Sequence, residues 1–540
     1  MKEKHYWFLG FTAVFAALAG YVFWGTWSTD FAPVMPDCPF MYGPDYAMGT
    51  LRGMFTSGKW IPSDICKFIG TPYFWQELQY ALALYCAALG MAYFCRGRGL
   101  SRLASYGSGL LLAFSGYWCT LFSAGHLGWF QWMTSGVFAF GLVDRAVRKG
   151  KLRHWLLLGA CVAWGSCHQT DLWLLFTVLT GAYFIWCCVR ERKFPWKGAV
   201  LSAAVFLAVG APYIRSAFVN DLAGRDKQIE EGQTISPKDS AATDEREKRW
   251  IFVTNWSLPP GETAEFLVPR LNGDTSCPMT LSLGARYGTG VKPYTGALGR
   301  PKDAPAGNYR QHSLYVGFIT CLLALLGTFH GVRGLFNRTI EQSEQSNNRT
   351  ILFFLVAAIL CWLFSMGRYC EPVYRVIFSL PFGDYLRAPV KWHHLTEFSI
   401  CVLAAYGIEG LRGLRGSRGF WVLVAVVLIG AIDLARVDHL YCAPVDLREA
   451  KRQNCNMQMT FLRKDDFNNP QVAAMVQAKK IVALAQPNPE MYLVGVLNPW
   501  GRPTDKPWPA AGLATWLALL SLVTSGAVVA VSAKSRRNLV

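Results

Sequence analysis

Basic and titratable side chains gather at residues 387–394, directly before an apolar run whose length and hydropathy predict a membrane helix. Arg387, Lys391 and His394 supply a guanidinium, an ammonium and an imidazole, and Pro389 is suited to the first turn of that helix. Lys391 and His394 are three residues apart, so they share one helix face. Because a helix N-terminus adds N–H donors and an arginine can hold a phosphate with two hydrogen bonds, this spacing predicts a phosphate-binding site.

The same residues have a second interpretation, an interfacial belt. In that case Arg387 and Lys391 extend toward water while Trp392 anchors the helix at the lipid headgroups. Glu397, further along the helix, could also neutralise Lys391. A carboxylate inside an apolar run nevertheless favours a polar cavity, because ionisable groups in a membrane usually face an internal partner or a ligand.

A candidate general base lies elsewhere in the chain. Asp30 directly follows the first apolar run, which places its carboxylate at the membrane surface. There it could deprotonate a hydroxyl group. The alternative is a solvated loop or capping residue. Asp45 follows Gly43 and Pro44, a sequence that favours a turn.

Further polar candidates occur where apolar runs reach the expected outer side. Arg215 ends the seventh run, and His126 precedes the fourth; we group both with the candidate ligands of a phosphate or substrate. Each histidine alone fits an ordinary interfacial residue, but their placement on one side matches the side that carries the longest connections. Of the 9 histidines in the chain, those at the outside or its boundary are His126, His168, His312, His393, His394 and His439.

The composition is that of a membrane protein. Of 540 residues, 52% are hydrophobic and only 16% are charged, whereas about a quarter are charged in a soluble protein. About 12 apolar stretches approach or reach the length that crosses a bilayer core of roughly 30 Å. The chain is therefore predicted to be an all-α polytopic membrane protein. The stretches lie at residues 7–26, 74–95, 104–122, 127–143, 155–167, 172–189, 198–214, 313–332, 350–366, 394–411, 419–434 and 509–533.

The net charge of +18 comes from clusters of Lys and Arg between these stretches. Every second connection, starting with the N-terminus, is net basic, which is the pattern of cytoplasmic loops. We therefore expect both termini in the cytoplasm and no nucleic-acid binding. The long connections lie on the opposite side, so we expect the working face outside.

These connections divide the chain into three parts. Residues 1–434 form the transmembrane region, with outside loops at 27–73 and 215–312. Residues 435–508 form a C-terminal outside segment. Residues 509–540 comprise the last transmembrane helix and a basic cytoplasmic tail.

Several familiar sites are missing from the sequence. About half of the 16 cysteines lie inside apolar stretches, where a thiol behaves as a small apolar group. No CxxC or Cys/His spacing of a zinc site occurs, so no metal site is expected. No nucleotide-binding motif occurs either, which gives no reason to expect a cytosolic nucleotide donor.

Several short motifs resemble the YfhO-like family of bacterial membrane proteins, within the GT-C superfamily of polyprenyl-phosphate-dependent glycosyltransferases. The likeness covers most of residues 1–435. The motifs that carry it are LSRLA at 100–104, FSGY at 114–117, GHL at 125–127, LYVG at 314–317, FGDYLRAP at 382–389 and LAAYG at 403–407.

The resemblance implies a GT-C-like helical bundle that transfers a sugar from a polyprenyl-phosphate donor on the outer, periplasmic face of the bacterial cytoplasmic membrane. It implies that Asp30 is the general base, with Asp37 or Asp45 as alternatives. Arg387, and with it Lys391, match the region that neutralises the donor phosphate. The resemblance also implies an optional Mg²⁺ or Mn²⁺ ion. The acceptor, a glycan, lipid or protein, stays open.

Two other functions remain as alternatives. A flippase or transporter of lipid-linked saccharides would bind the headgroup phosphate without chemistry. Inverted repeats and charges at the membrane midplane would favour a transporter, but no repeat is visible and the ionisable groups lie mostly at the outer boundary. A non-catalytic membrane scaffold would instead use its outside loops to bind partners.

Overall fold

The structure is a computed structural model of the whole chain. It describes residues 2–27, 31–33, 72–124, 132–166, 170–216, 245–273, 312–336, 342–381, 383–412, 417–442, 444–446, 448, 452–453, 455–488, 491–499 and 512–537.

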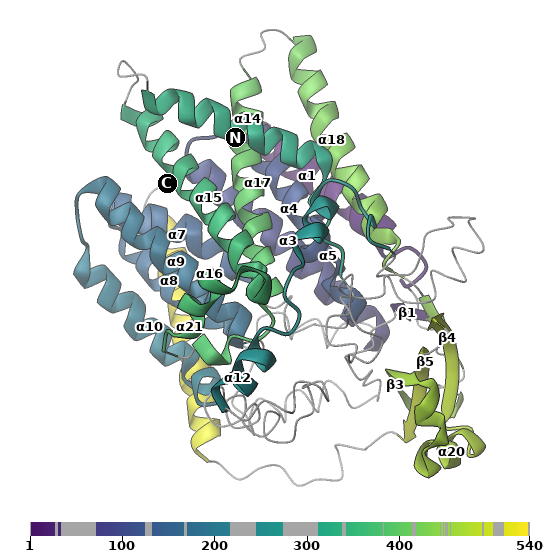
Figure 1. Cartoon of the computed structure of the whole chain (residues 1–540). Helices are drawn as coiled ribbons and strands as arrows, with labels where there is room; N and C mark the ends of the chain where they lie inside the picture. Colours follow the sequence, from purple (N-terminus) through teal and green to yellow (C-terminus); the bar gives the residue numbers. More distant parts are fainter. Residues whose placement is uncertain are drawn as a thin grey trace.

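Long helices dominate the described residues and form a bundle (Figure 1). Every apolar stretch predicted from the sequence contains a helix, and 7 of the helices are long and apolar enough to cross a membrane. The prediction of an all-α polytopic membrane protein is therefore confirmed. These 7 are α1 (Lys2–Val22), α3 (Pro72–Gly97), α9 (Thr170–Glu191), α10 (Trp196–Ser216), α15 (Gln342–Ser365), α18 (Ser417–His439) and α21 (Leu513–Arg537).

The other predicted stretches form helices that are shorter or more polar. They are α4 (Arg102–Ala113), α7 (Gly136–Lys149), α8 (Leu152–Gly165), α14 (Phe318–Phe336) and α17 (His393–Leu411). Short elements connect the long ones: α5 (Gly116–Cys119), η2 (Thr120–Ala124), η3 (Trp132–Thr134), α12 (Glu245–Val253), η6 (Pro260–Phe266), η7 (Gly367–Cys370), α16 (Glu371–Phe378), η8 (Gly383–Tyr385) and η9 (Pro389–Trp392).

The stretch predicted at 104–122 is wrong as a single helix, because the chain breaks between α4 and α5. The Gly116 N–H donates to the carbonyl oxygen of Tyr315 at 2.8 Å. A Cβ at Gly116 would lie 2.7 Å from that oxygen, so only glycine permits this approach. The break depends on a partner far along the chain, which hydropathy does not report.

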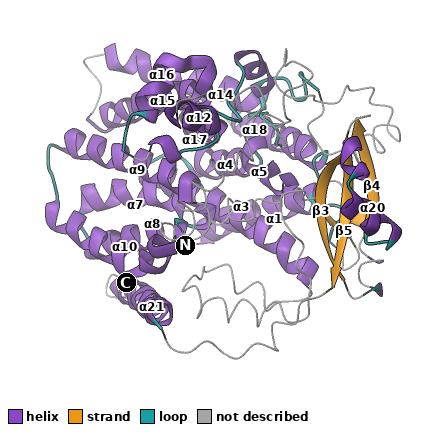
Figure 2. Cartoon of the chain, turned by 60° about the horizontal axis from the view of Figure 1, so that its bottom comes forward, coloured by secondary structure: helices purple, strands orange, loops and turns teal. Residues whose placement is uncertain are grey.

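Residues 435–508, which the sequence predicts to be an outside segment, contain a small sheet that the sequence did not predict. Strands β3 (Cys455–Arg463), β4 (Ile481–Asn488) and β5 (Met491–Pro499) are antiparallel in the order β3-β5-β4. With the helix α20 (Pro470–Gln477) and the 3₁₀ turn η10 (Lys464–Asn468), they form a unit at one side of the helical bundle (Figure 2). The all-α membrane part therefore carries a mixed α/β appendage.

A second, shorter strand pair joins the segment after α1 to the segment after α18. Strand β1 (Phe31–Pro33) runs antiparallel to β2 (Pro444–Asp446), with Phe31 opposite Asp446. The residue directly before β1 is Asp30, so the candidate base is attached to a strand whose partner lies just beyond α18.

Helices α14 and α17 cross at two glycines. A Cβ at Gly327 would collide with the carbonyl oxygen of Leu403, and one at Gly407 would collide with the carbonyl oxygen of Leu323. Small residues allow such close approach, which matters in a membrane because lipid tails weaken the hydrophobic drive for helices to associate. This crossing fixes α17, the helix that begins with the predicted phosphate site.

A buried ionic cluster joins several helices near their ends. The carboxylate of Asp144 on α7 accepts hydrogen bonds from Arg98 at 3.0 Å, from Arg148 at 2.9 Å and from Arg190 at 2.9 Å. Arg98 directly follows α3 and Arg190 lies on α9, and Arg98 also donates to two side chains of α15. Asp144 is 0% exposed, so one carboxylate holds four helices together.

Replacing Asp144 with Asn should lower the free energy of unfolding by about 3–5 kcal/mol, because buried guanidinium groups would lose their counter-charge. Titration of detergent-solubilised protein with SDS measures the change. Glu371→Gln is the matched control, since its ion pair with Arg375 is exposed and should contribute less than about 1 kcal/mol. Equal effects of the two substitutions would contradict the role of the cluster.

Candidate functional site

Three histidines from distant parts of the chain converge on one tyrosine. The ring centroid of Tyr117, on α5, lies 5.1 Å from that of His312, 5.5 Å from that of His393 and 4.4 Å from that of His394. All four side chains are buried. The histidines that the sequence placed on the outer side are therefore partly gathered into one polar cluster, which the break between α4 and α5 makes possible.

Glu397 extends this cluster by one turn along α17. Its carboxylate is 0% exposed; Oε1 lies 3.2 Å from Nε2 of His393 and accepts a 3.2 Å hydrogen bond from the Tyr117 N–H. Its Oε2 accepts no hydrogen bond within the described part of the chain. In the structure the Glu397 carboxylate therefore contacts His393, whereas the sequence suggested that it could neutralise Lys391. The polar cavity that the sequence suggests around Glu397 stays a prediction.

The chain enters α17 through a constrained turn. Ala388 has a φ of +63°, which residues with a side chain seldom adopt. Its N–H donates to the carbonyl oxygen of Val253 at 3.0 Å, and the Val390 N–H donates to that of Trp256 at 3.2 Å. Pro389 has no N–H. Some of the backbone N–H groups expected to bind a phosphate therefore already donate hydrogen bonds within the protein. The side chains must then provide most of the anion binding at this turn.

Two cationic side chains flank the turn. The Arg387 guanidinium carbon lies 4.4 Å from the ring centroid of Trp256 and 5.1 Å from that of Phe252. Stacking on aromatic faces orients a guanidinium in a way that is compatible with hydrogen bonds to a phosphate in its own plane. Lys391, one turn further on, is only 6% exposed. A buried ammonium beside a half-buried guanidinium makes this turn electropositive.

The remaining predicted site residues are not brought to this turn by any described contact. Arg215 is exposed at the end of α10, a helix that packs mainly on α8 and α21. Asp30, Asp45 and His126 lie outside the described residues. His439 lies elsewhere, with Nδ1 3.1 Å from the carbonyl oxygen of Val22.

The described residues before and after Asp30 nevertheless contact other elements, one of which lies next to the Tyr117 cluster. Before Asp30, Phe23 packs on Phe122 of η2, with ring centroids 5.0 Å apart. In the same turn, the Thr120 hydroxyl accepts the Ser313 N–H at 2.9 Å, next to His312. After Asp30, β1 pairs with β2. These contacts place the ends of the described chain on either side of residue 30, Trp27 and Phe31, in segments that pack on η2 and on β2.

The sequence analysis missed Asp438, because the apolar stretch was ended at residue 434. In the structure α18 continues to His439, which places Asp438 inside a membrane helix. Its carboxyl group is 0% exposed beside the thiol of Cys119, and the hydrogen bonds of the described residues satisfy neither carboxyl oxygen. A longer hydropathy window would have included this acid in the apolar stretch, because it lies in the last turn of its helix.

The described residues do not assemble a metal site. Nowhere in these ranges do three or more His, Cys, Asp or Glu side chains come together in a way that could hold a metal ion. The Mg²⁺ or Mn²⁺ ion implied by the family resemblance has no ligand set here, and no chemical step is assigned to it.

Comparisons with known proteins return little. No model of a known protein family matches the chain, and no curated protein matches it. Among solved structures it is similar to the crystal structure of ArnT from Cupriavidus metallidurans bound to undecaprenyl phosphate, at 13% identity and a TM-score of 0.29. The match covers 90% of this chain and 98% of that chain. At this TM-score the superposition is loose, so ArnT places no residue of this site.

The His393–Glu397 contact should appear as a coupling energy in a double-mutant cycle. With His393→Gln and Glu397→Gln, we expect a coupling of about 1–3 kcal/mol in the free energy of unfolding, because the two buried polar side chains are in contact and each variant alters the partner's environment. The control cycle pairs Glu397→Gln with His439→Gln, which should add to within about 0.5 kcal/mol. Additivity in both cycles would show that the buried pair has no energetic role.

Proposed function

We propose that this protein is a membrane glycosyltransferase of the GT-C type. It would move a sugar from a polyprenyl-phosphate donor to an acceptor on the periplasmic face of a bacterial cytoplasmic membrane. The observation that carries this proposal is the electropositive turn at the start of α17, where Arg387 stacks on Trp256 and Lys391 is buried. Cations at such a position favour an anionic ligand or an internal counter-charge, and the ligand proposed here is the lipid phosphate of the donor.

The proposed chemistry needs two functions at this end of the bundle. An acceptor oxygen attacks the anomeric carbon of the sugar, and the bond between that carbon and the phosphate oxygen breaks. Arg387 and Lys391 would stabilise the charge that develops on the departing polyprenyl phosphate. A carboxylate, with Asp30 as the first candidate and Asp45 as the alternative, would take the proton of the acceptor hydroxyl.

The buried cluster supports this assignment in a different way. Tyr117, His394 and the His393–Glu397 pair lie directly behind the turn, so they would hold the start of α17 while the donor binds and leaves. His394 would also contribute to the phosphate site. His126 and Arg215 remain proposed ligands of the donor or acceptor, with no described contact to the turn.

The test uses wild-type protein reconstituted with bacterial lipids, radiolabelled undecaprenyl-phosphate sugars and a membrane extract as acceptor. We expect label in a new product. Arg387→Ala should lower the rate about 10²–10³-fold by removing charge stabilisation. Asp30→Asn should lower it about 10²–10⁴-fold by removing the base, and Asp45→Asn distinguishes the two candidate acids.

Arg436→Ala is the control for a general effect of lost positive charge. Arg436 is exposed and pairs with Asp433 on α18, so this variant should keep the wild-type rate. Full activity of Arg387→Ala would reject the phosphate role of the turn. Labelled lipid that crosses the bilayer without any transfer would establish a flippase in place of a glycosyltransferase.

A further inference from the structure

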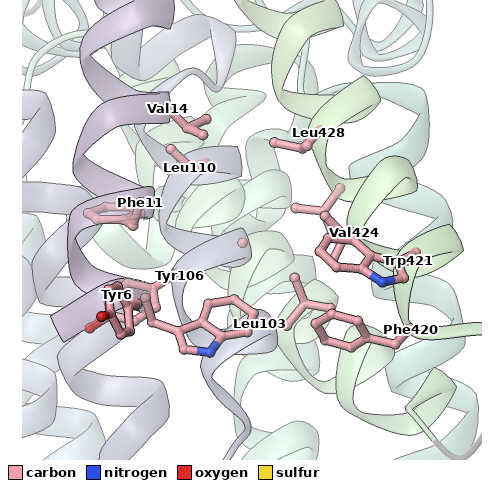
Figure 3. Close-up of a pocket in the computed structure, with 14 residues that line it drawn as sticks. Tyr6, Phe11, Val14, Leu103, Tyr106, Leu110, Phe420, Trp421, Val424 and Leu428 are labelled. Atoms are coloured by element: carbon pink, nitrogen blue, oxygen red, sulfur yellow. The ribbon is translucent and has the colours of Figure 1, made fainter. Parts of the chain in front are cut away.

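An apolar groove of about 410 Å³ opens between α1, α4 and α18 (Figure 3). Helices α1 and α18 form its walls, with Val14 on one side and Leu428 on the other, and α4 lines its floor with Leu103 and Leu110. Its volume falls within the range of about 300–1,000 Å³ that is typical of ligand sites.

Two contacts between α1 and α18 define the groove. Near the start of both helices, the rings of Trp7 and Phe420 meet edge to face, with centroids 6.2 Å apart. Near their ends, the His439 ring lies 4.8 Å from that of Tyr21. Between these contacts the helices leave room for a ligand. On α1 the groove runs from Tyr6 to Val14, about 12 Å at 1.5 Å per residue.

These dimensions fit a lipid chain. A groove of about 12 Å spans most of one leaflet, which is about half of a hydrocarbon core of roughly 30 Å. Its lining is apolar, and aromatic side chains such as Trp421 and Tyr6 stand at the end nearest the helix starts, where membrane proteins place their interfacial belt.

Basic residues stand at that same end. Arg102 begins α4 one residue before the lining residue Leu103, and the exposed Arg418 precedes Phe420 on α18. Glu409, near the end of α17, accepts the Ser101 N–H at 2.7 Å and pairs with Arg412. The mouth of the groove is therefore electropositive, which complements an anionic headgroup.

We propose that this groove binds one anionic phospholipid of the cytoplasmic leaflet, with an acyl chain along α4 and its phosphate near Arg102 and Arg418. The groove starts at the helix ends opposite to Tyr117, since α4 leads from Arg102 toward α5. This lipid site is therefore distinct from the proposed donor site, and it does not depend on the glycosyltransferase function.

Two glycines of α1 provide a matched test. Gly10 lines the groove, and a Cβ built there meets nothing within 4 Å, so Gly10→Phe should fill the groove without a clash. Gly20 lies on the same helix with equally open space and outside the groove, so Gly20→Phe is the control. The melting temperature of each variant reports whether it folds as the wild type does.

Native mass spectrometry of the delipidated protein, titrated with phosphatidylglycerol or phosphatidylcholine, measures the binding. We expect one tight phosphatidylglycerol in the wild type and in Gly20→Phe, and at least tenfold weaker binding in Gly10→Phe. Arg418→Gln should reduce the preference for phosphatidylglycerol over phosphatidylcholine.

Three results would overturn the proposal. Equal binding of the two phospholipids by the wild type would show that the basic residues at the mouth of the groove do not select an anionic headgroup. This result does not depend on any variant. Undiminished phosphatidylglycerol binding by Gly10→Phe would place the lipid elsewhere. Displacement of phosphatidylglycerol by undecaprenyl phosphate in the wild type, but not in Gly10→Phe, would make a polyprenyl chain the occupant of the groove.

Discussion

The bundle depends on the burial of one carboxylate among guanidinium groups. Asp144 binds Arg98 and Arg190 away from water and also binds the partly exposed Arg148, and Arg98 in turn donates to side chains of α15. In a membrane, helices gain little from burying apolar surface against each other, so internal polar contacts and close backbone packing decide which helices associate. The Asp144 cluster supplies the polar contacts for α3, α7, α9 and α15.

Close packing then sets the position of α17. Gly327 and Gly407 bring α14 and α17 so near that neither position tolerates a Cβ. A third glycine, Gly116, lets α5 approach the segment that carries His312 and Tyr315. Because these approaches involve backbone atoms, they hold α17 against α14, and α5 against the Tyr315 segment, more firmly than side-chain packing alone would.

The candidate site and its surroundings combine two kinds of polar environment. Arg387 and Lys391 make the turn before α17 electropositive, whereas Glu397 and Asp438 are acids buried within helices. Buried ionisable groups in a membrane protein are costly and are usually retained for a function or for a specific partner. A working face at the end of the bundle where these groups lie stays a prediction.

The sequence by itself determined the class of the protein, the location of the helices and the basic turn at residues 387–394, because hydropathy and charge are local properties. It also singled out Glu397 as a group that needs a polar environment. Only the tertiary structure decided that His393 pairs with Glu397, that Gly116 interrupts a predicted span, and that residues 455–499 form a sheet. Each of these features depends on contacts between residues far apart in the chain, and no periodicity in the sequence records such contacts.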